Sequence, residues 1–194
     1  ENNKKISLKL NKIKFKFDLR NASLFLETSE PNLSYLSLKM PIETIKVYLD
    51  LVSVIISKTK IDLIDVNTNE ISINELKKII TKTKPSNLNS FINNKIENGN
   101  LKANIKLYLN DKQQIQNYII RGEVKDMNAN LLNKINLKKT NFNFFADTSD
   151  VIIKNIKSET DGILIESGNI QMIKGDKIEL KSELQTKINI DENN

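Results

Sequence analysis

Apolar and polar residues alternate along much of the chain with a period of two. The longest run starts at Ile178, where the even positions are apolar or small and the odd positions are charged or polar as far as Asn189. Successive side chains of a β-strand point to opposite faces, so this pattern predicts a long strand with one apolar face and one wet face. The same alternation recurs over residues 6–10, 13–19 and 101–109.

Shorter runs and turn residues extend this pattern. Further strands are expected at residues 116–124, 139–146, 151–156, 163–166 and 169–173. Residues that tolerate positive φ predict hairpin turns between the runs, at Asn98-Gly99, Asp161-Gly162, Gly168-Asn169 and Gly175-Asp176. The runs before and after Asn11 have opposite parity, which predicts a bulge or turn near Asn11 and Lys12. A wet face on each strand favours antiparallel pairing, and we therefore expect a meander of about seven strands in the second half of the chain.

The pattern changes between residues 41 and 94. Pro41 suits the first turn of a helix, and the apolar residues after it recur at three- and four-residue spacing as far as Val52. Residues 60–73 are extended in pattern again. Asn74 is expected to cap a short helix over 75–82, and another short helix is expected over 87–94. These elements form a helix-strand-helix insert.

The predicted fold is mainly β with a small α component. We expect a long antiparallel meander curled into an open, taco-like groove and interrupted by the insert near residues 41–94. The chain then divides into N-terminal groove strands at 1–39, the insert at 40–95 and the meander at 96–194. Because it begins with Glu1 rather than Met, we expect one continuous fragment of a longer protein.

Composition narrows the classes of function. The 194 residues are 39% hydrophobic, which is enough for a sizeable core. The net charge of +6 comes almost entirely from lysine, with arginine only at Arg20 and Arg121. Lys, Asn and Ile dominate the chain and all have AT-rich codons, so the basic charge says little about a partner. Nucleic-acid sites favour arginine and interleaved aromatics, and no nucleic-acid partner is expected.

The chemistry available to the chain is limited. It has no His and no Cys, which removes the commonest general base, the usual zinc ligands and any disulfide. A Gly-rich phosphate loop is missing too, and acidic pairs such as Asp147 and Asp150 lack the spacing of a calcium loop. We predict that the protein is not an enzyme and that it holds no cofactor and no metal.

Two sequence patterns bear on membranes. The apolar stretches are far shorter than the roughly 20 residues that cross a bilayer, and the chain does not open on a signal-peptide pattern. The helix around Ile79 carries Lys77, Lys78, Lys82 and Lys84, a pattern that suits an anionic membrane surface. A packed helix with a solvated lysine face explains these residues better.

The apolar strand faces are the remaining candidate for function. The insert supplies only two or three short helices, so part of the apolar surface should stay available to lipid chains or an adjoining repeat. The candidate groove residues are Phe15, Phe17, Ile105, Leu107, Leu109, Leu180, Leu184 and Ile188. In the alternative, two halves of the sheet fold onto one another and these residues are plain core.

Several segments resemble the AsmA-like superfamily, which includes the TamB and YhdP proteins. This family repeats a sequence pattern to which three segments are similar, namely Met40-Pro41-Ile42-Glu43-Thr44-Ile45-Lys46, residues 60–66 and residues 71–76. Residues 96–103, 120–124 and 161–170 look like its Gly-punctuated strands. The resemblance covers most of the chain from Ala22 onward.

The resemblance implies a lipid transfer protein of the bacterial envelope. Its full-length form would be anchored in the inner membrane by a segment outside this chain and would span the periplasm towards the outer membrane. The groove would shelter the acyl chains of phospholipids and continue into adjoining groove segments. The residues alone leave another class open, a structural or adhesive β module that binds other proteins through its strand edges.

Overall fold

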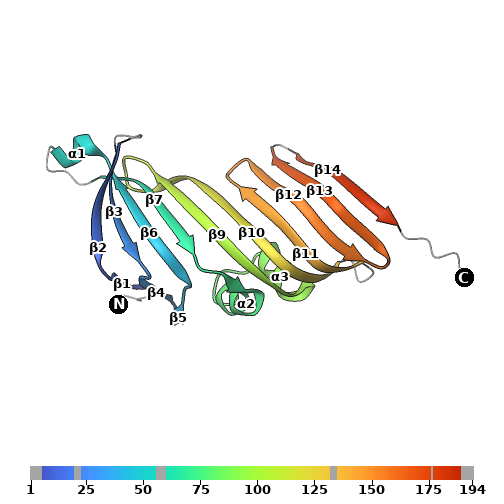
Figure 1. The fold of residues 1–194 in the computed structure, drawn as a ribbon. Coiled ribbons are helices and arrows are strands. Elements are labelled where there is room, and N and C mark those ends of the chain that lie inside the picture. Colours follow the sequence, from blue (N-terminus) through green and yellow to red (C-terminus); the bar gives the residue numbers. More distant parts are fainter. Residues whose placement is uncertain (1–5, 20–22, 56–59, 132–134, 176, 189–194) are drawn as a thin grey trace, which may run out of the picture. The chain divides into compact units, whose positions relative to one another are not determined.

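The structure is a computed structural model that describes residues 6–19, 23–55, 60–131, 135–175 and 177–188 (Figure 1). These residues form 14 strands and three helices. Every strand pair whose register is given is antiparallel. The prediction of a mainly β, antiparallel fold with a small helical component is confirmed.

The chain forms two compact units. Unit 1 comprises Glu1–Asn69 and Ala103–Ile120, and unit 2 comprises Glu70–Lys102 and Arg121–Asn194. Strands β9 (Ile96–Leu109) and β10 (Ile115–Leu131) each contribute one part to each unit. The units thus group segments by contact, whereas the division at 1–39, 40–95 and 96–194 followed the order of elements and stays a prediction.

Unit 1 contains a large and a small sheet. The large sheet has the order β2-β3-β6-β7-β9 and consists of β2 (Ile13–Asp18), β3 (Ser23–Ser29), β6 (Ile42–Leu49), β7 (Ile61–Thr68) and the end of β9. The small sheet has the order β1-β4-β5 and consists of β1 (Ile6–Lys9), β4 (Asn32–Tyr35) and β5 (Leu38–Lys39).

The same three chain segments supply both sheets, because each is interrupted once. The interruption between β1 and β2 lies at residues 10–12, where the parity change predicted it. Asn11 lies in this break. Its side-chain amide donates to the carbonyl oxygen of Glu30, in the break between β3 and β4, at 2.6 Å. The other two breaks lie at residues 30–31 and 40–41.

The helix expected from Pro41 to Val52 is wrong. Residues Ile42–Leu49 form strand β6, and only Leu51–Ile55 is helical (α1). The apolar positions of this stretch fit both periods, but β-branched and aromatic residues favour the extended form. Its neighbours β3 and β7 pair with both edges of β6, which satisfies the backbone of a strand.

Unit 2 is a meander with two helices. It contains β8 (Ile71–Ser72), α2 (Ile73–Ile80), α3 (Asn87–Lys95), parts of β9 and β10, and then β11 (Ile135–Ala146), β12 (Asp150–Thr160), β13 (Ile163–Lys174) and β14 (Ile178–Ile188). The long strands follow the order β9-β10-β11-β12-β13-β14, and β8 pairs with β9. Strands β11 to β14 run side by side (Figure 1). The predicted strands 163–166 and 169–173 are one strand, β13.

Two of the predicted turns are wrong. Asp161 and Gly162 do form the turn between β12 and β13, with φ values of 38° and 82°. Gly99 and Gly168 instead lie inside β9 and β13. A Cβ on Gly168 would lie 2.5 Å from Leu184 Cδ2, so this glycine permits close packing rather than a turn. Gly175 lies between β13 and β14, and its predicted partner Asp176 is outside the described residues.

Both predicted short helices after the insert strand exist. Helix α2 is capped by Ser72 rather than Asn74, because Ser72 Oγ accepts from the N–H of Glu75 at 3.3 Å and Glu75 accepts from the N–H of Ser72 at 3.1 Å. Helix α3, capped by Ser86, matches the helix predicted at 87–94. Among the described residues, no helix has the length and apolar character needed to span a bilayer.

Buried apolar side chains are few in each unit. Among the described residues of unit 1 they are Phe25, Ile42 and Ile45. In unit 2, a cluster of Val124, Met127 and Ala129 is surrounded by partly buried neighbours, namely Ile96, Leu101, Leu131, Leu137, Phe142 and Phe144. Much of the apolar surface of the strands in each unit is therefore only partly removed from water.

Candidate functional site

One face of the large unit 1 sheet is apolar. Residues directly opposite one another on paired strands project from the same face, so the strand register identifies its members. One row runs across five strands as Phe15, Leu26, Val47, Ile64 and Leu107. A second row is Ile13, Thr28, Ile45, Val66 and Ile105, and a third begins with Phe17, Leu24 and Leu49. These three rows are the unit 1 apolar face.

This face is incompletely covered. Phe15 is 74% exposed and Phe17 51%. The central residues of the first row are half-buried, and in the three rows only Thr28 and Ile45 are buried. Packed cores bury such side chains almost completely, so the first and third rows keep apolar surface in contact with water.

The opposite face of the same sheet is charged and ordered. Its central row alternates in sign across the strands in the order Lys14, Glu27, Lys46, Asp65 and Lys106. Glu27 accepts a hydrogen bond from Lys16 Nζ at 2.6 Å, and Lys46 Nζ lies 3.8 Å from its other oxygen. The bond from Lys16, helped by the nearby lysine charges, holds the pKa of Glu27 below its usual value.

Neighbouring rows of the charged face add further cross-strand contacts. The rings of Phe25 and Tyr48 stack with centroids 5.0 Å apart. Asn67 Nδ2 donates to Thr44 Oγ1 at 3.0 Å and its Oδ1 accepts from Asn104 at 2.9 Å. A one-residue slip of any strand would break these pairs and invert both faces, so the polar face fixes the register that assembles the apolar one.

The structure separates the predicted groove residues into two groups. Phe15, Phe17, Ile105 and Leu107 share the unit 1 apolar face, and Leu109 follows Leu107 by strand alternation. The other three belong to β14 of unit 2, namely Leu180, Leu184 and Ile188. The prediction missed the middle of the unit 1 face, which consists of Leu24, Leu26, Val47, Ile64 and Val66. Alternation over 23–29 and 42–49 is the signal that could have found it.

Unit 2 also has an apolar face. Its rows include Val151, Met172 and Leu180 on three adjacent strands, and Gly168 opposite Leu184. The described residues of β14 are all exposed, with Leu180 at 68%. This edge strand therefore presents apolar side chains to water along its whole length.

Bulges keep the unit 2 face apolar along the strands. Asp126, Lys139 and Asn155 lie within β10, β11 and β12 and have positive φ values of 50°, 48° and 57°. Each inserts an extra residue, so apolar positions that are otherwise two apart become three apart. Val124 and Met127 are both buried as a result.

Asparagine side chains bind the backbone at these bulges. The N–H of Asp126 donates to Asn141 Oδ1 at 3.1 Å, that of Lys139 to Asn128 Oδ1 at 3.0 Å, and that of Asn155 to Asn169 Oδ1 at 3.3 Å. In each case the asparagine lies on an adjacent strand. The amides thus replace ladder hydrogen bonds that the bulges interrupt.

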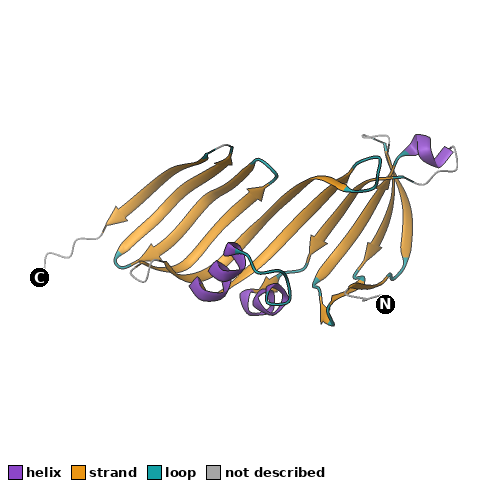
Figure 2. Ribbon diagram, turned by 180° about the vertical axis from the view of Figure 1, so that it is seen from behind, coloured by secondary structure: helices purple, strands orange, loops and turns teal. Residues whose placement is uncertain are grey.

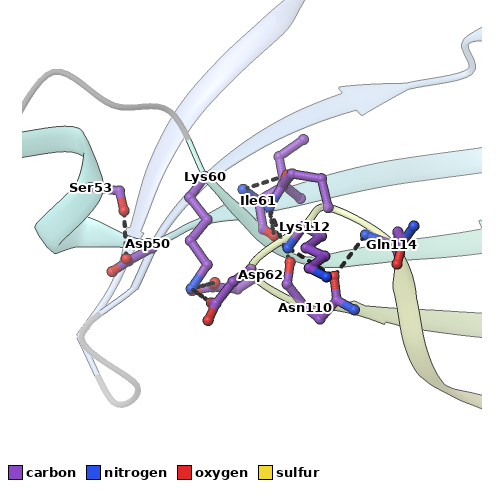
Figure 3. A network of polar contacts seen from close by, with 10 residues as sticks. Asp50, Ser53, Lys60, Ile61, Asp62, Asn110, Lys112 and Gln114 are labelled. Carbon is purple, nitrogen blue, oxygen red and sulfur yellow. Dashed lines mark hydrogen bonds and ion pairs between the residues drawn. The ribbon is translucent and has the colours of Figure 1, made fainter.

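A polar network fixes one end of unit 1 (Figure 3). Lys60 Nζ lies 2.9 Å from Asp111 Oδ1 and 3.7 Å from Asp62. The bond to Asp111 is the main reason why the pKa of Lys60 is raised. Gln113 binds both the N–H and the carbonyl of Ile61, at 3.1 and 3.2 Å. These contacts join the β9–β10 turn to the start of β7, which is a structural role.

A hollow of about 450 Å³ lies on unit 2. Its lining combines two cationic side chains with aromatic and aliphatic groups, namely Arg121, Gly122, Asn143, Phe144, Phe145, Ile152 and Lys154. The Arg121 guanidinium lies 5.4 Å from the centroid of the Phe145 ring. Within the described part of the chain, no group of three or more acidic side chains is placed to hold a metal ion.

Comparisons with known proteins do not assign a family. No protein-family model, no curated protein and no solved structure matches the chain. The AsmA-like resemblance, the periplasmic location and the membrane anchor therefore stay predictions. The features that bear on function are therefore the strand faces of unit 1 and of unit 2.

Proposed function

We propose that this chain is a segment of a lipid transfer protein and shelters acyl chains on the apolar face of its sheet. The observation that supports this best is the unit 1 apolar face, whose first row crosses five strands while none of its members is buried. Contiguous exposed apolar surface on a soluble domain usually marks a binding site.

The dimensions of the rows suit an acyl chain. Adjacent strands lie about 4.8 Å apart, so a row across five strands is about 19 Å long. This is comparable to an extended long-chain acyl group. Each methylene that leaves water on this surface gains about 0.8 kcal/mol. The charged opposite face keeps the segment hydrated while the apolar face is occupied.

The AsmA-like resemblance gives this activity a setting. In that setting the chain is one section of a conduit that carries phospholipid through the bacterial periplasm and supports the outer membrane. Anchoring and delivery belong to regions outside this chain. Transfer along such a face requires no covalent chemistry, in keeping with the expectation that the protein is not an enzyme.

The proposal is tested by native mass spectrometry of the purified protein, followed by lipid extraction. Phospholipid should co-purify with the wild type and be lost from Leu107→Asp, because a carboxylate at the β9 end of the first row opposes apolar binding. Phe15→Asp should weaken occupancy with little effect on folding, since Phe15 is 74% exposed on an edge strand.

A control variant accompanies these two substitutions. Ser7→Asp adds the same charge at an exposed position of β1 and should retain the lipid. A lipid-free wild type would contradict the proposal, as would a Phe15→Asp variant with full occupancy. Circular dichroism of each variant separates loss of lipid from loss of fold, and an unfolded Leu107→Asp would point to a closed core.

The free edge of β14 favours a second candidate function, a non-catalytic structural or adhesive module. Within the described part of the chain, β14 ends the strand order with β13 as its one neighbour, and its residues are all exposed. Its outer backbone groups are available to a strand of another protein. A lipid-free, monodisperse protein that gains β-structure with a partner would support this function.

A further inference from the structure

The α2–α3 hairpin is strongly basic. Between Glu75 and Glu97 the sequence has five lysines and no acidic residue. Both lysines of α2 are engaged within the fold. Lys77 Nζ donates to the carbonyl oxygen of Ile96 at 2.5 Å, and Lys78 lies close enough to Glu75 to contribute to the lowered pKa of that carboxyl.

The same hairpin exposes apolar side chains. Leu88 is 64% exposed and Phe91 44%, both on α3. Residues three apart lie on the same side of a helix, so the two form one small patch. Asn89 and Ile92 are half-buried, which shows that another side of α3 faces the protein.

Hydrogen bonds bring the basic and apolar groups together. Asn89 Nδ2 donates to the carbonyl oxygen of Lys84 and to Thr83 Oγ1, both at 2.9 Å. The loop that follows α2 is thereby held against the first turn of α3, where Leu88 precedes Asn89. Lys82 and Lys84 are exposed in this loop, and the two helices lie next to one another (Figure 2).

We propose that this hairpin tip, residues 81–91, docks on an anionic lipid bilayer. Leu88 and Phe91 enter the interface between headgroups and acyl chains, and Lys82 and Lys84 lie at the phosphates. The charge and the apolar patch together select this surface. A nucleic acid would match the lysines but would leave Leu88 and Phe91 in water. The inference does not depend on acyl chains binding to the unit 1 apolar face.

Tryptophan fluorescence on the full chain tests insertion directly. The protein has no Trp, so Phe91→Trp introduces a single reporter. With vesicles of phosphatidylcholine and phosphatidylglycerol, its emission should shift to the blue and be quenched by brominated acyl chains. Phosphatidylcholine vesicles alone should have little effect. Ile6→Trp, at an exposed position of β1 outside the unit 1 apolar face, is the matched reporter and should not be quenched on docking.

Vesicle flotation tests the charged and apolar parts separately. Lys82→Glu/Lys84→Glu should weaken partitioning to the anionic vesicles by at least about tenfold. Leu88→Ser/Phe91→Ser should also weaken it. Lys112→Glu/Lys177→Glu changes the net charge equally at other exposed sites and should float like the wild type.

Several results would overturn the inference. The wild type would fail to float, or the Lys112→Glu/Lys177→Glu control would lose as much binding as Lys82→Glu/Lys84→Glu. A bound Phe91→Trp variant with unchanged emission would also contradict it, as would tighter binding to duplex DNA than to the vesicles. Leu107→Asp, which tests the proposed acyl-chain function, should still float. Failure of either idea is therefore visible without the other.

Discussion

The side-chain oxygen of Asn128 accepts a hydrogen bond from the backbone N–H of Lys139 at 3.0 Å, and Lys139 has a φ of +48°. Residues other than glycine pay roughly 1–2 kcal/mol for a left-handed backbone. The bond offsets part of this cost and satisfies an N–H that the bulge removes from the ladder. Asn128 thus helps to maintain the side-chain alternation of β11 that places Leu137 beside the buried cluster of unit 2.

Substitutions on the two sides of this bond should have opposite effects. Asn128→Ala should lower the free energy of unfolding by about 1–2 kcal/mol, because the bulge N–H loses its acceptor. Lys139→Gly should raise it by about 0.5–1 kcal/mol, since glycine adopts this φ without strain. Lys138→Gly, next to the bulge and without a positive φ, is the control and should be destabilising. Urea unfolding decides between them, and equal losses at 138 and 139 would refute this account of the bulge.

The buried hydroxyls of Thr140 and Ser158 form a second measurable pair. Their oxygens are 2.7 Å apart and each residue is 2% exposed. Thr140→Val should cost about 1–2 kcal/mol, because it leaves Ser158 with only a long bond to the Lys138 carbonyl oxygen at 3.4 Å. The double variant Thr140→Val/Ser158→Ala should cost no more than the single one. Strictly additive losses in this double-mutant cycle would show that the two hydroxyls are not coupled.

The sequence predicted strands well where only one periodicity fits. The run from Ile178 alternates over eleven residues and forms β14 as expected. Residues 42–49 failed because Ile42, Ile45 and Leu49 satisfy a helical period while Ile45, Val47 and Leu49 satisfy a strand. The choice was made by pairing with β3 and β7, which are distant in sequence.

The sequence predicted which kind of residue forms the candidate site, but not how these residues come together on one face. The alternation identified both Phe15 and Leu107 as apolar positions of strands whose other face is polar. That they belong to one row follows only from the registers of four strand pairs. The bulges at Asp126, Lys139 and Asn155 were also invisible in the sequence, because positive φ at these residues depends on asparagines supplied by neighbouring strands.

Gly168 should be sensitive to any added side chain. Its Cβ would lie 2.5 Å from Leu184 Cδ2 and 3.3 Å from Ile156 Cβ. Gly168→Val should lower the free energy of unfolding by about 1–3 kcal/mol through overpacking. Part of the loss should return in Gly168→Val/Leu184→Ala, which removes the nearest obstacle. Gly175→Ala, whose nearest contact would be 3.6 Å away, should be close to neutral in the same thermal unfolding assay.

Glu27 should make the stability of unit 1 depend on pH. The hydrogen bond from Lys16 lowers its folded pKa, so its stabilisation is complete above the unfolded value of about 4.3 and is lost as the pH falls through the folded pKa. Glu27→Gln should therefore cost about 0.5–1 kcal/mol at neutral pH and progressively less below about pH 4. In a Lys16→Met background the cost at neutral pH should shrink, because the principal partner is gone, and high salt should reduce it as well. Urea unfolding measured from neutral to acidic pH provides the test, and a cost that stays constant with pH would show that Glu27 stabilises the sheet by packing rather than by its charge.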